Sequence, residues 1–183
     1  MKTSTKTLPG VALALLLPCV GYAAAPAPTM CAKPDQPIFS CSLKGTQKTV
    51  SICAAGDVAK GSASFYYAYG SNSAKPELFY PARGAQVADP FTRTHLMFAG
   101  NTGGYAYAFV NGGFKYVVYA ISGSDDQEDD GLIVMKDGEK KALKRTACEA
   151  GTITDSDNAD IVRATLKWKK DPSIDQNGLP DSH

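Results

Sequence analysis

The chain has 183 residues, of which 44% are hydrophobic and 20% charged, and its formal net charge is +1. This near-neutral balance excludes the class of nucleic-acid-binding proteins that display a strongly basic stripe. It also gives no reason to expect attachment to an anionic membrane surface, and no segment after the N-terminus is apolar enough to predict stable membrane insertion.

The N-terminus is typical of a secretory signal peptide. A basic start precedes an apolar run over Val11–Gly21, and small residues then occupy positions 21 and 23. We predict that residues 1–23 are a signal peptide cleaved after Ala23, which places the mature chain in the periplasm of a Gram-negative bacterium or outside the cell. Cys19 raises the alternative of a lipoprotein, but Pro18 precedes it where lipoproteins have a small residue.

The mature chain retains four cysteines, an even number that predicts two disulfides in an exported domain. They lack the C-x-x-C spacing typical of many metal sites, so we predict neither a metal nor another cofactor. A Cys41–Cys53 bridge is disfavoured because it turns the hydrophobic residues of two neighbouring strands to opposite faces. We favour a bridge from Cys41 or Cys53 to Cys148, and the full set is Cys31, Cys41, Cys53 and Cys148.

Short runs rich in aromatic and β-branched residues predict eight or nine strands in one antiparallel β-sandwich or barrel. This single disulfide-stapled domain spans residues 38–170 and follows an extended, Pro/Ala-rich lead-in over residues 24–37. A segment without periodicity, Arg83–Arg93, is expected to be a surface loop. The predicted strands are Ile38–Leu43, Lys48–Ala54, Ser62–Tyr69, Glu77–Tyr80, His95–Ala99, two within Tyr105–Ala120, Gly131–Lys136 and Lys140–Lys144.

The segment Tyr105–Ala120 is the clearest hairpin of the chain. Either Asn111-Gly112 or Gly112-Gly113 suits the two-residue turn, and both choices leave the same side chains on each face. Since both faces are apolar, we expect burial on both sides. Antiparallel pairing also brings the loop before this hairpin and the acidic run after it to the same end of the sheet.

After the last predicted strand, the sequence favours a C-terminal helix over residues 160–168. Asp157 provides an N-cap, and lysines follow at the helix end, where they suit the helix dipole. A strand remains the alternative for residues 158–169, because Val162, Ala164, Leu166 and Trp168 alternate with polar residues. Residues 171–183 are polar and contain proline and glycine, so we expect a loose tail.

No catalytic set is apparent, so we predict a non-enzymatic protein. His95 is the one histidine outside the predicted tail, and no Gly-x-Ser-x-Gly motif occurs. The glycine-rich loop Gly100–Gly104 precedes a strand, so it lacks the helix N-terminus that binds phosphate. A cell-envelope hydrolase that uses two convergent carboxylates is an alternative.

The acidic run Asp125–Asp130 places five carboxylates in six residues. On a rigid scaffold such a run can steer binding to a cationic partner protein. A solvated turn is one alternative. A calcium loop is another, since Asp126, Glu128, Asp130 and Asp137 match ligand positions of an EF-hand although the flanks indicate strands. The candidate partner-binding residues are Asp125, Asp126, Glu128, Asp129, Asp130, Asn101 and Tyr105.

Taken together, a signal peptide, a disulfide-stapled antiparallel β domain and no catalytic set resemble the small periplasmic inhibitor and immunity proteins of Gram-negative bacteria. The resemblance covers residues 31–148 and assigns no role to any residue. It implies a protein that binds and inhibits a cell-envelope hydrolase or a secreted toxin. A further alternative is a small-ligand-binding β-barrel that uses the aromatic faces of Tyr66, Tyr107 and Tyr116.

Overall fold

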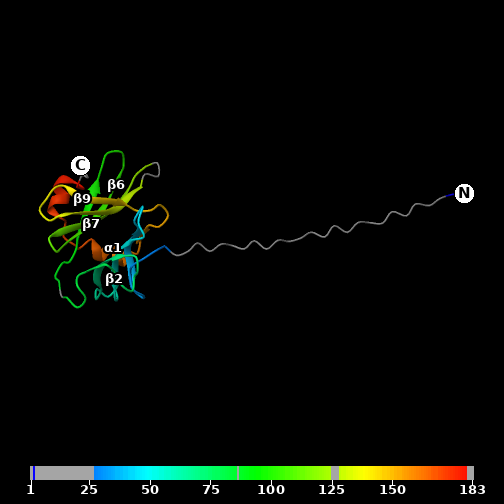
Figure 1. The fold of residues 1–183 in the computed structure, drawn as a ribbon, viewed down its shortest axis with the longest axis horizontal. Helices are drawn as coiled ribbons and strands as arrows, with labels where there is room; N and C mark the ends of the chain where they lie inside the picture. Colours follow the sequence, from blue (N-terminus) through cyan, green and yellow to red (C-terminus); the bar gives the residue numbers. More distant parts are fainter. Residues whose placement is uncertain (1, 3–26, 86, 125–127, 181–183) are drawn as a thin grey trace.

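The chain forms two antiparallel five-stranded sheets that pack face to face, as the computed structural model shows for residues 2, 27–85, 87–124 and 128–180 (Figure 1). The predicted β-sandwich is therefore confirmed. The elements in the described residues are β1 Gln36–Ser42, β2 Thr49–Ala55, β3 Ser64–Gly70, β4 Leu78–Tyr80, β5 Thr92–Met97, β6 Gly103–Asn111, β7 Phe114–Ser122, β8 Glu128–Lys136, β9 Ala142–Ala147, β10 Thr154–Asp155, α1 Ala159–Thr165 and α2 Pro172–Asn177.

The first sheet has the strand order β10-β1-β2-β3-β4 and the second has the order β5-β6-β7-β8-β9. The connection between β4 and β5 crosses from one sheet to the other and includes most of the predicted surface loop. Its Phe91 is fully buried against Tyr80, Phe109 and Trp168. No helix in the described part of the chain is both long and apolar enough to cross a membrane.

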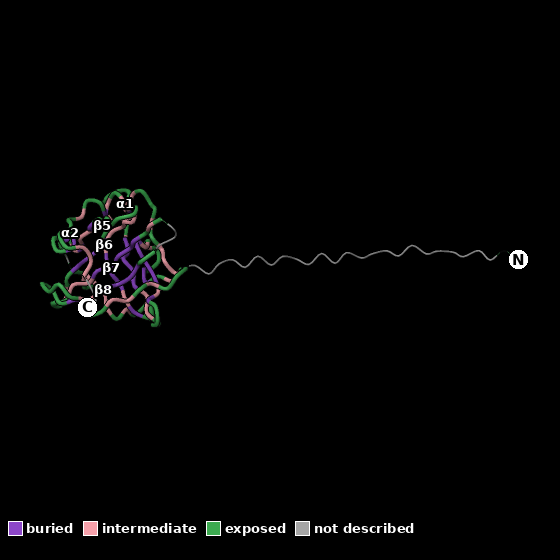
Figure 2. Tube along the Cα trace, turned by 90° about the horizontal axis from the view of Figure 1, so that it is seen from above, coloured by how far each residue is buried: buried purple, intermediate pink, exposed green. Residues whose placement is uncertain are grey.

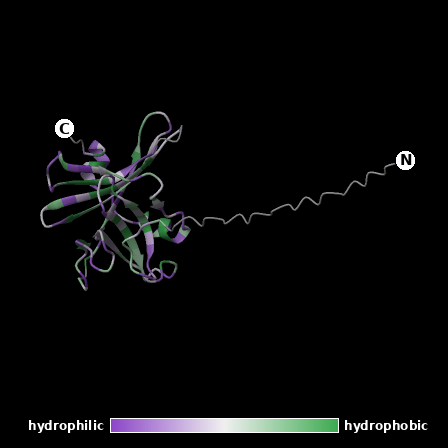
Figure 3. Cartoon of the chain, turned by 45° about the vertical axis from the view of Figure 1, so that its right-hand side comes forward, coloured by the Kyte–Doolittle hydropathy of each residue, from purple (hydrophilic) through white to green (hydrophobic). Residues whose placement is uncertain are grey.

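The main core lies between the two sheets, where the inward residues of both meet. Buried residues gather in the strands at the centre of the molecule, and exposed residues follow the surrounding loops (Figure 2). Colouring by hydropathy shows the same division, with hydrophobic residues concentrated on the strands (Figure 3). This is the alternation expected of a sandwich whose strands each present one face to the core.

The β6–β7 hairpin is buried on both faces, as its pattern predicts. Its turn is Gly112-Gly113, with φ of 60° and 79°, which only glycine adopts without strain at both turn positions. Phe109 and Tyr107 face the core between the sheets. On the opposite face, Tyr119 and its apolar neighbours form a second cluster that is covered by Ile174.

Two disulfides fasten the sandwich, as predicted. Cys41 pairs with Cys148, which is one of the two pairings that the sequence favoured, and ties β1 to the end of β9. Cys31 pairs with Cys53 and holds the lead-in on the outer face of the first sheet. Disulfides of this kind are typical of proteins that fold in an oxidising compartment. The predicted signal peptide lies outside the described residues apart from Lys2.

The predicted C-terminal helix is confirmed as α1, although its N-cap is Asn158 and not Asp157. The Asn158 side chain accepts hydrogen bonds from the backbone N–H groups of Asp160 and Ile161. After α1, Trp168 packs edge-on against Phe65, with ring centroids 4.9 Å apart. The helix thereby closes one side of the core.

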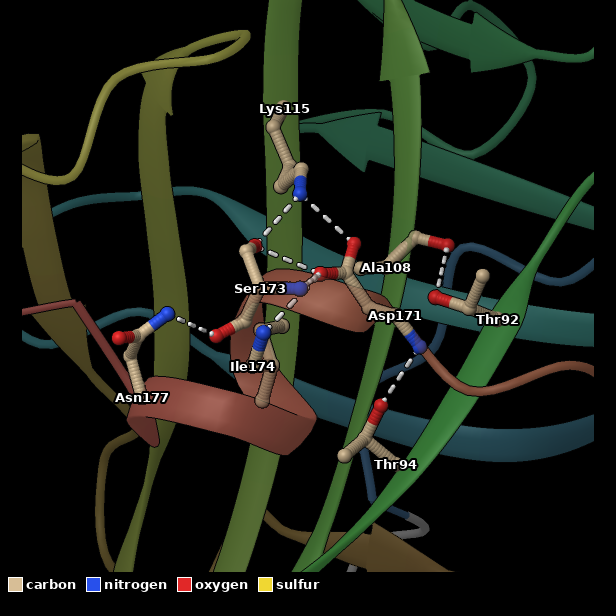
Figure 4. Close-up of polar contacts among 8 residues, drawn as sticks. All are labelled: Thr92, Thr94, Ala108, Lys115, Asp171, Ser173, Ile174 and Asn177. Carbon is tan, nitrogen blue, oxygen red and sulfur yellow. Dashed lines mark hydrogen bonds and ion pairs between the residues drawn. The ribbon is translucent and has the colours of Figure 1, made fainter.

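The expectation of a loose tail from residue 171 is wrong for the segment that forms α2. Asp171 caps this helix, and its backbone N–H donates to Thr94 Oγ1 at 2.9 Å (Figure 4). Lys115 Nζ lies 2.7 Å from Asp171 Oδ2 and 3.0 Å from Ser173 Oγ, which docks the helix on the second sheet. Burial alone favours a neutral Asp171, but bonds from Lys115, Ser173 and the helix backbone outweigh it and lower the pKa of this carboxyl.

Candidate functional site

The predicted partner-binding residues were expected at one end of the second sheet, and the described ones lie there. Gly103 of β6 pairs with Ser122 of β7, which pairs with Glu128 of β8. The loop that contains Asn101 therefore lies at the same end of the sheet as the start of β8, with the end of β7 between them. Asp125 and Asp126 lie outside the described residues, and the strand pairing described above involves neither of them.

The second half of the acidic run is a strand and not a loop. Glu128, Asp129 and Asp130 are the first residues of β8, so successive side chains point to opposite faces. Asp129 Oδ2 lies 2.8 Å from Arg145, and its Oδ1 accepts a hydrogen bond from the Tyr119 hydroxyl at 3.1 Å. The charge of Asp129 is thus compensated within the sheet, while Glu128 is exposed.

Asp130 faces the interior and is only 9% exposed, so it is not available to a partner protein. Its Oδ1 accepts a hydrogen bond from the backbone N–H of Ile121 at 3.1 Å. Burial, together with the charges of Glu128 and Asp129, raises the pKa of this carboxyl to about 6. The assignment of Asp130 to a contact surface is therefore corrected.

Tyr105, another predicted partner contact, is half-buried and lies on the core face of β6. It is partly buried against the core between the sheets, where its ring lies 5.0 Å from that of Tyr107. The Arg93 guanidinium lies over the Tyr105 ring at 4.7 Å, and burial raises the pKa of the Tyr105 hydroxyl. Alternate residues of a strand point to the same face, so Tyr105 lies on the same face of β6 as Tyr107 and not with the exposed loop.

The loop before β6 is a tight, exposed turn. Asn101 has a φ of 55° and Gly100 a φ of 77°, and the Phe98 backbone N–H donates to the Thr102 carbonyl at 2.8 Å. Ser124 Oγ donates to the Gly100 carbonyl at 3.1 Å, which fastens the loop to the end of β7. Asn101 is exposed at the tip of this turn.

Beside this turn lies a shallow hollow of about 350 Å³. Phe98 and Ile121 give it apolar walls, and Glu128 and Asp129, the first two residues of β8, complete its lining. Phe98 is 47% exposed and the preceding Met97 is 79% exposed. We refer to this feature as the acidic hollow, and its lining residues are Phe98, Thr102, Ile121, Glu128 and Asp129.

Phe98 was predicted as part of a strand, and its role in the hollow was missed. The strand β5 ends at Met97, one residue earlier. A signal was present in the sequence, because Leu96, Met97 and Phe98 are three consecutive apolar residues. In a strand with one buried face, such a run must expose at least one large apolar side chain.

The calcium alternative is wrong for the three predicted ligands that the structure describes. Glu128 and Asp130 lie near the start of β8, and Asp137 follows its end. Asp130 and the strand's last residue are six steps of about 3.3 Å apart, or about 20 Å, so these carboxylates do not reach one ion. Within the described residues, no three metal-ligating side chains gather.

The other singled-out residues do not form one site. His95 is an exposed residue of β5, opposite Tyr105. Tyr66 lies on the outer face of the first sheet, where its hydroxyl donates to Asp35 Oδ2 at 2.8 Å and accepts from the Ala32 N–H at 2.8 Å. Tyr107 is buried between the sheets, and Tyr116 lines a separate cleft.

Comparisons of this chain with protein-family models, with curated proteins and with solved structures found no match.

Proposed function

We propose that this chain is a non-enzymatic, exported binding protein whose acidic hollow takes up a basic side chain of a partner protein. The observation that carries the proposal is the presence of two acidic residues beside an apolar wall in one concave, exposed site. Inhibition of a basic cell-envelope hydrolase or secreted toxin is the role that suits such a site in an exported protein.

Lysine and arginine match this geometry because each has a long apolar stem and a charged head. The stem would pack on Phe98 and Ile121, and the head would reach around the end of the sheet to Glu128, the first residue of β8. Asp129 already binds Arg145, so Glu128 is the acidic residue of the lining whose charge is left for a partner. Within the described residues, no ion pair joins Glu128 to a cation of its own chain.

The surroundings of the hollow supply the apolar contacts that hold a protein interface together. Met97 and Phe98 are large exposed side chains on a turn fixed by backbone hydrogen bonds. Interfaces gain most of their affinity from a few such central residues, while charges at the edge steer the encounter. Substituting Phe98 should therefore affect the dissociation rate, and substituting Glu128 should also affect the association rate and its salt dependence.

The proposal is tested with purified protein against a panel of basic lysozymes, by calorimetric titration and by their rate of peptidoglycan hydrolysis. We expect Glu128→Gln and Phe98→Ala each to weaken binding and inhibition about tenfold or more, which is 1.4 kcal/mol or above. Glu139→Gln and Leu143→Ala are matched controls, because both residues are exposed near the opposite end of β8.

Failure of every lysozyme to bind would refute inhibition of this class of hydrolase. Binding that survives both Glu128→Gln and Phe98→Ala would refute the role of the acidic hollow. Equal losses in the control variants would show that the effect does not come from the acidic hollow.

A further inference from the structure

A second concave site lies between the two sheets, away from the acidic hollow. It is a cleft of about 330 Å³, which is within the size range of small-molecule sites in proteins. The first sheet contributes Tyr67 and Tyr69 of β3 together with the β1–β2 turn. The second sheet contributes Tyr116 of β7 and the middle of β8 and β9. We call this the inter-sheet cleft.

The walls of the inter-sheet cleft are apolar and aromatic. Leu43 and Leu132 are buried, while Tyr69, Tyr116 and Val134 are half-buried with one side towards the cleft. The Cys41–Cys148 disulfide lies close to both edges of the cleft. Cys41 is two residues before Leu43 in the first sheet, and Cys148 is two residues after Thr146 in the second. A covalent link at this point holds the two sheets together in the free protein, so the cleft is preformed.

Tyr67 contributes to the floor of the cleft, and its hydroxyl is a polar group that has no partner in the described part of the chain and is closed off from solvent. Tyr67 is fully buried, and its ring packs against Phe109 with centroids 4.8 Å apart. None of the described residues makes a hydrogen bond with the Tyr67 hydroxyl. Burial, and then the nearby Tyr69 and Tyr116 hydroxyls, raises the pKa of Tyr67, so this hydroxyl stays protonated and is able to donate. Leaving such a donor unsatisfied costs about 1–3 kcal/mol.

Charged groups occur only at the outer rim of the cleft's lining. Glu77 is engaged by Lys48 in an ion pair, and Lys144 is exposed on the opposite side. The floor itself has no cation to compensate a buried carboxylate, whose desolvation would be costly. The floor therefore suits a neutral acceptor, and the aromatic walls suit a ring.

We propose that the inter-sheet cleft binds a small, neutral, ring-containing molecule whose carbonyl oxygen displaces the side chains that cover the Tyr67 hydroxyl and accepts a hydrogen bond from it. The ring lies between Tyr116 and the aliphatic side chains of β8, and the carbonyl points to the floor. This site is independent of the acidic hollow, so the two assignments stand or fall separately.

The test uses the fluorescent naphthalene ketone Prodan, whose emission responds to burial and to hydrogen bonding of its carbonyl. A matched analogue, with a propyl group in place of the propionyl group, has the same ring and no acceptor. We expect both probes to bind saturably to the wild-type protein. Tyr67→Phe should weaken Prodan about tenfold and leave the propyl analogue unchanged, because it removes one hydrogen bond and no volume.

Tyr66→Phe is the control variant, since this neighbouring residue of β3 has its hydroxyl on the outer face of the sheet. It should not alter the affinity of either probe. Thr146→Trp, which enlarges a residue of the lining, should reduce the binding of both probes. The absence of saturable Prodan binding would overturn the proposal. Equal Prodan affinity in the wild type and Tyr67→Phe, or equal weakening of both probes by Tyr67→Phe, would overturn it as well.

Discussion

Replacing Tyr67 with phenylalanine is expected to stabilise the ligand-free protein, which is unusual for a substitution in a β-sandwich core. The phenylalanine ring keeps the contact with Phe109 at 4.8 Å and the more distant one with Tyr116 at 6.1 Å. The substitution removes only the hydroxyl, which has no hydrogen-bond partner among the described residues. The cost of burying this unsatisfied group, about 1–3 kcal/mol, is therefore relieved.

The expected gain is about 1–2 kcal/mol, because the hydroxyl oxygen also makes some packing contacts that are lost. In a domain of this size, each kcal/mol moves the melting temperature by about 2–4 °C. A rise of several degrees should follow in thermal unfolding monitored by circular dichroism, with a matching shift of the urea midpoint. Tyr66→Phe is the opposite case, since its hydroxyl makes two hydrogen bonds, and it should destabilise the protein.

A loss of 1 kcal/mol or more in Tyr67→Phe, with an unchanged urea m-value, would refute this reasoning. It would mean that the hydroxyl is satisfied in solution. The inter-sheet cleft would then lose the donor on which the assignment of a carbonyl ligand depends.

Three further predictions concern stability. Lys115→Met should destabilise the protein by about 3–5 kcal/mol in urea unfolding, because it leaves the carboxylate of Asp171 buried without its cation. The Asp130 carboxyl has a folded-state pKa of about 6, above its unfolded value of about 3.9. Its contribution to the free energy of unfolding is therefore most favourable below pH 4 and is lost as the pH rises to 6. The stability of Asp130→Asn relative to wild type should therefore increase between pH 4 and 6, by at most about 3 kcal/mol, and then level off; a difference independent of pH would contradict it. Removing Cys41–Cys148, whose cysteines are 107 residues apart, should cost about 4–5 kcal/mol in the loop-entropy model, against about 3 kcal/mol for the 22-residue separation of the other disulfide. An equal loss for the two disulfides would contradict the loop-length argument.

Local patterns were sufficient to predict the sandwich and the two-sided hairpin. Asn111-Gly112-Gly113 predicts a two-residue turn without deciding which two residues form it. Either choice keeps the same side chains together, so the alternation of strand residues assigns the side chains of β6 and β7 to their faces. The number of disulfides followed from the even cysteine count, and strand parity argued against Cys41–Cys53 but left both cysteines open as partners of Cys148. Cys31 was not assigned a partner because it lies in the proline-rich lead-in, where no periodicity indicates which face of a sheet the chain will cross.

The errors came from residues whose environment is set by distant parts of the chain. Asp171-Pro172-Ser173 is a helix start by local rules, but a six-residue helix is stable only where Lys115 and Thr94 receive it. Asp130 appeared to belong to a solvated run, yet strand pairing with β7 turned it inward.

The two concave sites were equally hidden from sequence reasoning. The unpartnered hydroxyl of Tyr67 results from how two sheets meet, and no local pattern in β3 predicts it. The acidic hollow joins Phe98, Ile121 and Glu128, which come from three segments and adjoin only once β5 to β8 have paired.

The outermost strands of both sheets limit where another chain can add a strand. β10 has two residues and β4 has three, and Pro81, which follows β4, has no N–H group to offer. β9 carries the cations Lys144 and Arg145, and β5 is held near its start by the hydrogen bond from the Arg93 N–H to the Lys169 carbonyl. Short, proline-ended, charged or covered edges oppose the growth of sheets from molecule to molecule. A chain rich in aromatic strands can in this way reach high local concentration without polymerising.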